Sequence, residues 1–189
     1  ILTNNIDIDE KVKSLRTHGI TKDKKRLMKN DGMWYYEMYE LGYNYRLSDL
    51  QCALGSSQLK RLDKFIKIRR EIAKIYDKAF INNNMITPKV GKGVGHSYHL
   101  YPLQVDFENY KITKSNFFEK MLEIGINLQV HYIPVHLQPY YKLNYGFKDG
   151  DFPISENFYK NEISLPIYPD LLNHDLKFVV KNILEILNK

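Results

Sequence analysis

Residues 42–55 read GYNYRLSDLQCALG, and this stretch is the most informative part of the sequence for predicting the fold. Ser48-Asp49-Leu50-Gln51 fits a capping box, in which the serine oxygen and the glutamine side chain each satisfy free amides at the start of a helix. The amide of Asn44 and the guanidinium of Arg46 stand just before that start. Helix N-termini attract anions, and arginine binds phosphate oxygens in a fork. The pattern permits a phosphate site, or else a turn at Asn44 with Arg46 paired to a carboxylate.

The segment that follows predicts a long helix. Apolar side chains recur at roughly helical spacing from residue 48 to residue 80 without a proline. We therefore expect one connecting helix over residues 48–80, longer than the usual helix and able to bridge two domains. Asn82-Asn83-Asn84 is expected to end it. Cys52 lies among its apolar positions, so a buried reduced thiol is expected, and a single cysteine excludes an internal disulfide.

Residues 1–47 show no uniform pattern. Ile1 to Thr3 is short, apolar and β-prone, which predicts a strand that Asn4-Asn5 ends. Asp7 to Leu15 carries an apolar face and acidic residues in its first turn, which is typical of a helix. Residues 16–47 are rich in tyrosine, glycine and charge without a steady period. We expect them to form a long ordered loop, and such loops are often functional.

Residues 81–189 alternate between strand and helix patterns. We expect strands at 99–105 and 126–132, helices at 114–123, 155–161 and 175–187, and a loop at 133–153. This order predicts a small α/β domain after the long helix.

The chain has 189 residues and a net charge of +6, which permits an anionic partner such as a nucleic acid, a membrane or a phosphorylated small molecule. The basic stretches at 22–26 and 60–70 are typical of solvated faces, and no nucleic-acid-binding signature accompanies them. No apolar run reaches the roughly 18 residues that a membrane span needs. We expect neither a nucleic-acid nor a membrane partner, and in the absence of a signal peptide the expected location is cytoplasmic.

A second polar group, His131-Tyr132-Ile133-Pro134-Val135-His136, follows an expected strand. The two histidines are five positions apart and separated by proline, which is not the helical spacing of a zinc hydrolase, and no cysteine or carboxylate stands close by. We therefore expect no metal site. Two interpretations stay open for these residues: a polar strand end that faces a ligand, or structural histidines with satisfied hydrogen bonds.

Several motifs in order resemble the DegT-type sugar aminotransferases. They are Arg16-Thr17-His18-Gly19, residues 42–55, Gln58-Leu59, Arg69-Arg70, the strand at 99–102, Gly125-Ile126, residues 129–136, and ISLPIYP at 163–169. The resemblance covers essentially the whole chain, and the ordered set is specific although each motif alone is weak. Residues 129–136 look most like the branch that makes UDP-4-amino-4,6-dideoxy-N-acetyl-altrosamine, an intermediate of pseudaminic acid synthesis.

The resemblance implies an α/β protein with the fold of the fold-type-I pyridoxal phosphate transferases. Residues 1–47 would be the end of the large cofactor-binding domain, 48–80 a connecting helix, and 81–189 the small C-terminal domain. Such enzymes are homodimers with shared active sites. The implied reaction transfers an amino group from glutamate to the C4 keto group of a UDP-linked 6-deoxy amino sugar. Alternatives are a transaminase of another nucleotide sugar, a dehydratase with histidine in place of the cofactor lysine, or a truncated non-catalytic partner subunit.

The resemblance also implies which residues form the site. In the family the Schiff-base lysine precedes a Gly-Glu-Gly-Gly loop and then a strand that resembles Ile1 to Asn5. We therefore expect this lysine upstream, no catalytic residue within residues 1–189, and no activity from these residues alone. Asn44 would reach the cofactor phosphate of the neighbouring subunit, and Arg46 would hold an anionic group nearby. His131, Tyr132 and His136 would lie on the substrate side. Arg16 and His18 would lie near the site without an assigned role.

Overall fold

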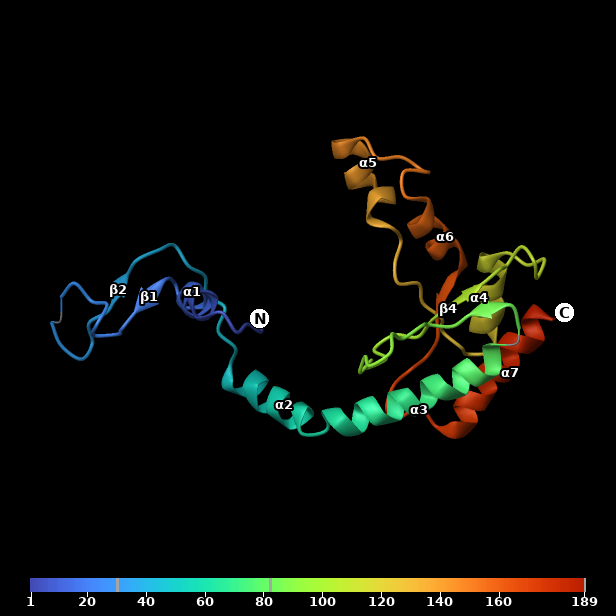
Figure 1. Ribbon diagram of the computed structural model, residues 1–189, viewed down its shortest axis with the longest axis horizontal. Helices are drawn as coiled ribbons and strands as arrows, with labels where there is room; N and C mark the ends of the chain where they lie inside the picture. The colour runs from blue at the N-terminus through green and yellow to red at the C-terminus, as the bar shows by residue number, and fades with distance from the viewer. Residues whose placement is uncertain (30, 82, 189) are drawn as a thin grey trace. The chain divides into compact units, whose positions relative to one another are not determined.

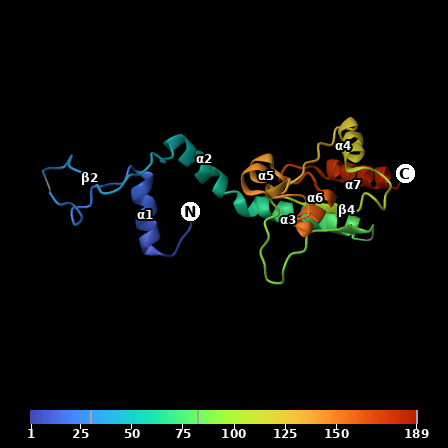
Figure 2. The same cartoon turned by 90° about the horizontal axis from the view of Figure 1, so that it is seen from above.

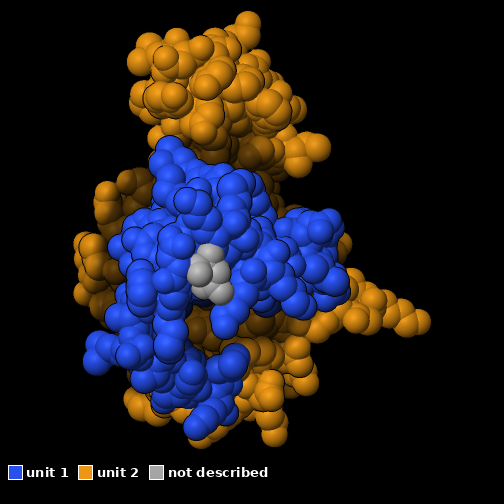
Figure 3. All heavy atoms as spheres, turned by 90° about the vertical axis from the view of Figure 1, so that its left-hand side faces the viewer, with its two compact units in different colours: residues 1–60 blue, residues 61–189 orange. Residues whose placement is uncertain are grey.

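The computed structural model describes residues 1–29, 31–81 and 83–188. The chain divides into two units, unit 1 with residues 1–60 and unit 2 with residues 61–189 (Figure 3). Within the described residues, no helix is long and apolar enough to cross a membrane.

Residues 48–80 form two helices where the sequence predicts one. Helix α2 (Asp49–Leu59) lies in unit 1, and α3 (Leu62–Phe80) lies in unit 2. Arg61 between them has φ −103° and ψ −2°, far from the helical values of about −63° and −42°. The prediction of a single helix was therefore wrong, because apolar spacing does not reveal one irregular residue that no proline or glycine marks. The division into 1–47, 48–80 and 81–189 stays a prediction.

Unit 1 begins with a helix that its own sequence caps. In α1 (Ile6–Arg16) the side-chain oxygen of Asn5 accepts the backbone N–H groups of Asp7 and Ile8 at 2.9 and 3.1 Å. This confirms the helix expected at residues 7–15. The strand expected at Ile1 to Thr3 is absent from the described residues, so that prediction was wrong. The hydroxyl of Thr3 accepts the N–H of Asn5 at 3.1 Å, so this segment contacts the N-cap residue of α1.

The expected loop over residues 16–47 contains two short strands. β1 (Ile20–Thr21) and β2 (Glu37–Met38) pair antiparallel, with Ile20 opposite Met38 (Figure 1). The rest of the segment has no regular element among the described residues, as expected.

The predicted capping box at the start of α2 is confirmed. The Ser48 hydroxyl accepts the N–H of Gln51 at 3.4 Å, and the Gln51 side chain accepts the N–H of Ser48 at 2.9 Å. No side chain of α2 is buried. Cys52 is therefore exposed, and the expectation of a buried thiol was wrong.

Unit 2 contains a three-stranded antiparallel sheet in the order β3-β4-β5. The strands are β3 (Met85–Ile86), β4 (Pro102–Val105) and β5 (Glu162–Ser164). In the pairing of β4 with β5, Leu103 lies opposite Ile163. The strand expected at 99–105 is confirmed over its last four residues, 102–105. α3 ends at Phe80, and Asn82, part of the expected stop, lies outside the described residues.

Three helices bury the core of unit 2 together with the sheet. α7 (Asn173–Leu187) packs against both α3 and α4 (Lys114–Glu123), and in both views α3 and α7 run side by side (Figures 1 and 2). The fully buried members of this core are Tyr76, Phe80, Tyr101, Leu103, Val105, Phe117, Met121, Ile163 and Ile183. Each large apolar side chain removed from water stabilises the unit by roughly 1.5–3 kcal/mol. The predicted helices at 114–123 and 175–187 are thus confirmed.

One arginine on α3 forms hydrogen bonds with the segments that flank the sheet. Nη1 of Arg69 on α3 donates to the carbonyl oxygen of Ile167 at 2.6 Å and to those of Tyr98 and His99 at 3.3 Å. These carbonyls come from chain segments before β4 and after β5, so a single side chain joins three parts of unit 2.

Two expectations for residues 126–153 were wrong. Residues 126–132 form no strand; only Gln129 makes a bridge, with Ser164, although Ile126 and Leu128 are buried alternately as a strand pattern predicts. Residues 133–153, expected as a loop, contain the 3-10 helix η1 (Val135–Leu137) and α5 (Pro139–Tyr145).

The prolines and glycines of that segment mark helix ends. Pro139 stands in the first turn of α5, where its missing N–H costs nothing, and Gly146 closes the helix in the left-handed conformation at φ 74°. Pro153 likewise stands in the first turn of α6 (Pro153–Asn161), which confirms the helix expected at 155–161.

Candidate functional site

Two sequence motifs of unit 1, far apart along the chain, are joined by their backbones. The N–H of His18 donates to the carbonyl of Tyr43 at 2.9 Å, and the N–H of Tyr45 donates to the carbonyl of Arg16 at 3.0 Å. Thr17 and Asn44 therefore face each other as an antiparallel bridge. The Arg16-Thr17-His18-Gly19 motif thus fixes the backbone position of Asn44.

Glycine is required where the two segments touch. A Cβ on Gly42 would lie 2.3 Å from the backbone nitrogen of Gly19, and a Cβ on Gly19 would lie 1.9 Å from the carbonyl oxygen of Glu40. Gly19 also has a φ of +68°, a conformation that L side chains rarely adopt. Both glycines are thus explained by backbone-to-backbone packing.

The structure brings Asn44 and Arg46 together. Nε of Arg46 donates to the side-chain oxygen of Asn44 at 3.0 Å, which leaves the amide nitrogen of Asn44 and the terminal nitrogens of Arg46 without a protein acceptor among the described residues. Arg46 forms no ion pair with a carboxylate in that part of the chain. Both side chains stand immediately before the N-terminus of α2. The group is exposed, cationic and rich in free donors, which suits an anion.

The loop between the two motifs is held by one carboxylate. Glu37 on β2 accepts the N–H groups of Met28 and Lys29 at 2.7 and 3.0 Å and the hydroxyls of Tyr35 and Tyr39. The Tyr39 hydroxyl, followed by the backbone N–H of Met28, lowers the pKa of Glu37 to about 2. The carboxylate therefore links residues 28–29 to residues 35–39 by hydrogen bonds.

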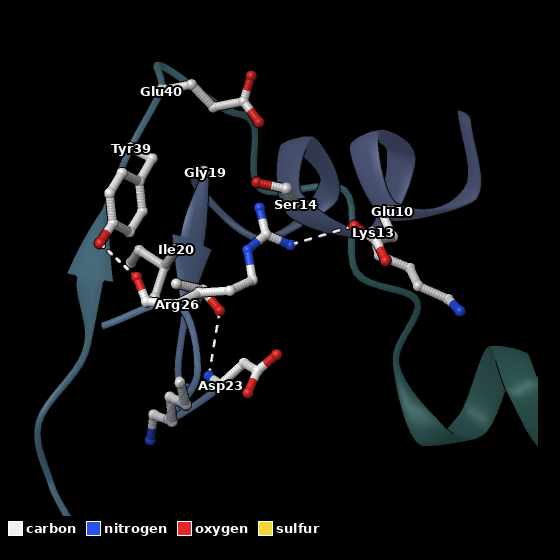
Figure 4. Close-up of a pocket in the computed structure, with 11 residues that line it drawn as sticks. Glu10, Lys13, Ser14, Gly19, Ile20, Asp23, Arg26, Tyr39 and Glu40 are labelled. Atoms are coloured by element: carbon white, nitrogen blue, oxygen red, sulfur yellow. Dashed lines mark hydrogen bonds and ion pairs between the residues drawn. The ribbon is translucent and has the colours of Figure 1, made fainter. Parts of the chain in front are cut away.

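A polar hollow of about 330 Å³ lies between α1 and the β1–β2 pair (Figure 4). Arg26 extends into it toward Glu10, at 3.4 Å, while the Tyr39 hydroxyl oxygen lies 2.6 Å from the backbone carbonyl oxygen of Arg26. Lys11 pairs with Glu40 at its edge. Charges of both signs line the hollow, so it offers no field of a single sign for a charged ligand.

In unit 2, His131 belongs to a hydrogen-bonded network with strand β5. Glu162 and Ser164 are two residues apart on that strand, so their side chains lie on one face. The Glu162 carboxylate is fully buried and accepts the backbone N–H of His131 at 3.1 Å. Nδ1 of His131 lies 2.7 Å from the hydroxyl of Ser164, which also contacts the Glu162 carboxylate. The network fixes both the backbone and the ring of His131.

The next residue, Tyr132, is 73% exposed, and its ring stands edge-on to the His131 ring at 4.6 Å between centroids. The two side chains therefore form one polar and aromatic surface. An exposed tyrosine beside a held imidazole offers hydrogen bonds and a stacking face to a ligand such as a sugar or a base.

His136 has a different environment from His131. It is only 7% exposed, its Nε2 lies 2.9 Å from the carboxylate of Glu156, and its ring packs on that of Phe152 at 4.7 Å. The imidazole, along with the N–H groups of Gly150 and Phe152, lowers the pKa of Glu156. Of the two interpretations left open by the sequence, His136 has the contacts of a structural histidine with satisfied hydrogen bonds.

The described residues contain no cluster of three or more histidine, cysteine, aspartate or glutamate side chains that could hold a metal ion.

Comparison with known proteins decides the family. The sequence pattern of the DegT/DnrJ/EryC1/StrS aminotransferase family matches residues 1–184. The chain belongs to this family. It is 43% identical over its whole length to the uncharacterized protein MJ1066 of Methanocaldococcus jannaschii, of which it covers 49%. It is 41% identical to a UDP-4-amino-4,6-dideoxy-N-acetyl-beta-L-altrosamine transaminase of Campylobacter jejuni, again over 100% of the chain and 48% of that protein.

A solved structure gives the same result. The chain matches Helicobacter pylori PseC, described as an aminotransferase involved in the biosynthesis of pseudoaminic acid, with a TM-score of 0.84 and 29% identity over 98% of this chain and 47% of that one. This DegT/DnrJ/EryC1/StrS chain thus has the fold of the fold-type-I aminotransferases and spans about half the length of the relatives it matches. Its family is one of sugar aminotransferases that use pyridoxal phosphate, and its relatives include transaminases of UDP-linked amino sugars.

Sequence reasoning missed three polar residues that hold the histidines of this family member: Glu156, Glu162 and Ser164. A signal existed for two of them, because the alternation Glu162-Ile163-Ser164 places both polar side chains on one face of a strand and the isoleucine on the other. Glu156 had none, because its partner His136 is 20 residues away.

Proposed function

We propose that this chain forms part of a pyridoxal-phosphate-dependent aminotransferase that acts on the C4 keto group of a UDP-linked 4-keto-6-deoxy amino sugar, with glutamate as the amino donor. The observation that carries the proposal is the group of Asn44, Arg46 and the N-terminus of α2, which the backbone bridge to Thr17 holds in place. The choice of sugar nucleotide rests on the similarity to the UDP-4-amino-4,6-dideoxy-N-acetyl-beta-L-altrosamine transaminase of Campylobacter jejuni.

The donors present fit a phosphate group. A phosphate dianion needs several N–H or O–H donors and positive charge, and Asn44 and Arg46 supply free N–H groups beside a helix N-terminus. Pyridoxal phosphate, when bound, supplies the electron sink that transamination requires. The role proposed for Asn44 is to bind the cofactor phosphate of the neighbouring subunit of a homodimer, and the role proposed for Arg46 is to hold an adjacent anionic group of the substrate.

Unit 2 is proposed to supply the substrate side. His131 and Tyr132 present an imidazole and a phenol at one exposed surface, and these groups suit the hydroxyl and amide groups of an amino sugar. His136, which is buried against Glu156, is proposed to act only by shaping the segment between η1 and α6. This narrows the substrate-side role that the sequence resemblance implied for it.

No lysine within residues 1–189 lies in the motif of the family's cofactor lysine. We therefore propose that this lysine, and with it the transfer of protons at the reacting carbon, belongs to another part of the protein. Residues 1–189 alone would then not catalyse transamination.

Subunit mixing tests both the activity and the shared site. An Asn44→Ala subunit is combined with one in which the cofactor lysine is replaced, and amino transfer from glutamate to a UDP-linked 4-keto-6-deoxy sugar is followed. In a mixed dimer one site then carries both defects and the other carries neither, so activity should return to a fraction of the wild-type value. The Asn44→Ala subunit mixed with itself is the control. Heterodimers that form without recovery of activity would show that Asn44 serves its own subunit.

A further inference from the structure

The buried polar side chains of the described residues are His136, Glu162 and Ser164, and two of these three belong to the His131 network. Glu162 is fully buried, at 0% exposure. A buried carboxylate is costly unless charge and hydrogen bonds compensate it. Its two oxygens accept from the N–H of His131 and from the hydroxyl of Ser164. Lys114 is partly buried and donates from Nζ to the carbonyl oxygen of Tyr159 at 2.6 Å; burial lowers its pKa, and the Glu162 carboxylate counteracts that effect.

The direction of these hydrogen bonds determines where the proton of His131 lies. A serine hydroxyl has a single proton, and an ionised carboxylate can only accept. Because Ser164 donates its proton to Glu162, its oxygen must accept at the 2.7 Å contact with Nδ1 of His131. Nδ1 therefore carries a proton, and in the neutral imidazole Nε2 then carries a lone pair.

We propose that Glu162 and Ser164 are positioning residues that hold neutral His131 in the Nδ1–H tautomer, so that Nε2 accepts a hydrogen bond from a donor group of the ligand. The ligand groups that this arrangement selects are hydroxyls and amide N–H groups of a sugar. Nε2 has no protein partner among the described residues, which leaves it available. The choice of a sugar as ligand rests on the proposed function, whereas the tautomer depends only on the network.

The tautomer is measured in the intact protein labelled with [15N]histidine, from the chemical shifts of the two ring nitrogens at a pH where the ring is neutral. Wild-type His131 should show a protonated Nδ1 and an unprotonated Nε2. His131→Asn identifies the signals by their loss.

Glu162→Gln should reverse the pattern. The glutamine oxygen can still accept the N–H of His131, but its amide donates to Ser164, whose hydroxyl must then turn toward Nδ1. The proton of His131 moves to Nε2. Ser164→Ala removes the acceptor of Nδ1 and should shift the ring toward the Nε2–H tautomer as well, which keeps the test decisive if the first variant does not fold. Glu156→Gln, at the other histidine–carboxylate pair, is the matched control and should leave the signals of His131 unchanged.

A wild-type His131 with its proton on Nε2 would overturn the proposal, as would a Glu162→Gln protein with a native backbone spectrum and an unchanged His131. Titration with UDP-N-acetylglucosamine, a stable UDP-linked amino sugar, separates this result from the proposed function. A shift at Nε2 on binding supports its role as ligand acceptor. Binding that leaves Nε2 unperturbed would overturn that role and the substrate-side assignment of His131, while the Nδ1–H tautomer would stand.

Discussion

Phe117 of unit 2 is fully buried, whereas Leu54 of unit 1 is 61% exposed. The two side chains illustrate how much more apolar surface unit 2 buries than unit 1. Unit 2 has a core that three helices and a sheet share. In unit 1 the only buried residue described is Gly19, and backbone bridges and polar contacts hold the segments together. Asn44 and Arg46, the proposed phosphate donors, lie in the unit without a core. The stability of the packed core and the proposed cofactor contact therefore depend on different regions of the chain.

The largest expected effect is on the core of unit 2. Phe117→Ala should lower the free energy of unfolding by about 3–5 kcal/mol, because it removes a buried ring and leaves a cavity. The matched change in unit 1, Leu54→Ala, should stay within about 0.5 kcal/mol in residues 1–189, since the side chain is already in water. Denaturant unfolding of the two variants measures the difference. Equal losses would show that α2 is buried in solution and would remove the contrast.

The next effect concerns binding. Asn44→Ala in the intact enzyme should weaken binding of pyridoxal phosphate by about 1.5–3 kcal/mol, because one phosphate oxygen loses a charge-assisted donor. Arg46→Ala should weaken the anionic substrate more than Arg46→Lys does, since lysine keeps the charge but loses the planar fork. Cofactor and substrate titrations check both. Unchanged cofactor affinity in Asn44→Ala would remove the phosphate role from unit 1.

A pair of glycines tests whether backbone packing alone holds unit 1. Gly42→Ala should destabilise the junction with residues 15–19 by about 1–3 kcal/mol, because its Cβ would overlap backbone atoms that cannot move aside. Gly55→Ala, on α2 with no atom near its Cβ, should instead stabilise by about 0.5–1 kcal/mol. Hydrogen exchange at the amides of His18 and Tyr45 reports the junction directly. Slow exchange at both amides in Gly42→Ala would contradict the packing argument.

The smallest effect is a pH dependence of the loop in unit 1. Since hydrogen bonds lower the pKa of Glu37 to about 2 in the folded chain, its contribution is complete above the unfolded value near 4.5 and is lost as the pH falls through about 2. The Glu37 carboxyl signal in NMR should titrate near 2, while the Tyr35 and Tyr39 rings become more mobile. Glu37→Gln should show the mobile rings at neutral pH. A titration near 4.5 would mean that the loop is open in solution.

The sequence predicted the elements that local chemistry specifies. The cap at Ser48 and the amphipathic face of 114–123 both follow from residue spacing, and each appears in hydrogen bonding or burial. The break at Arg61 could not be foreseen, because a single irregular residue leaves the apolar spacing intact. The loop expected at 133–153 was wrong since proline and glycine end a helix as readily as they form a loop.

The site was predictable only in part, for a related reason. Asn44 and Arg46 are two residues apart, and their contact follows from local sequence. The network around His131 joins residues 31 and 33 positions away, and no spacing rule connects them. The bridge between Thr17 and Asn44 is equally non-local, and the resemblance placed both motifs near the site without giving a reason. The structure supplies that reason in the hydrogen bonds of the backbone.

The backbone junction between residues 15–19 and 42–45 also bears on how the loop it encloses can change. Backbone hydrogen bonds of the two residues that flank Asn44 fix its position. Residues 20–41 therefore form a loop whose two ends are already held together. Lengthening such a loop adds little to the entropic cost of closing it, about 0.6 kcal/mol for each doubling of the loop length. Residues inserted or deleted beyond the pair formed by β1 and β2 should therefore change the loop without moving Asn44, the proposed phosphate donor.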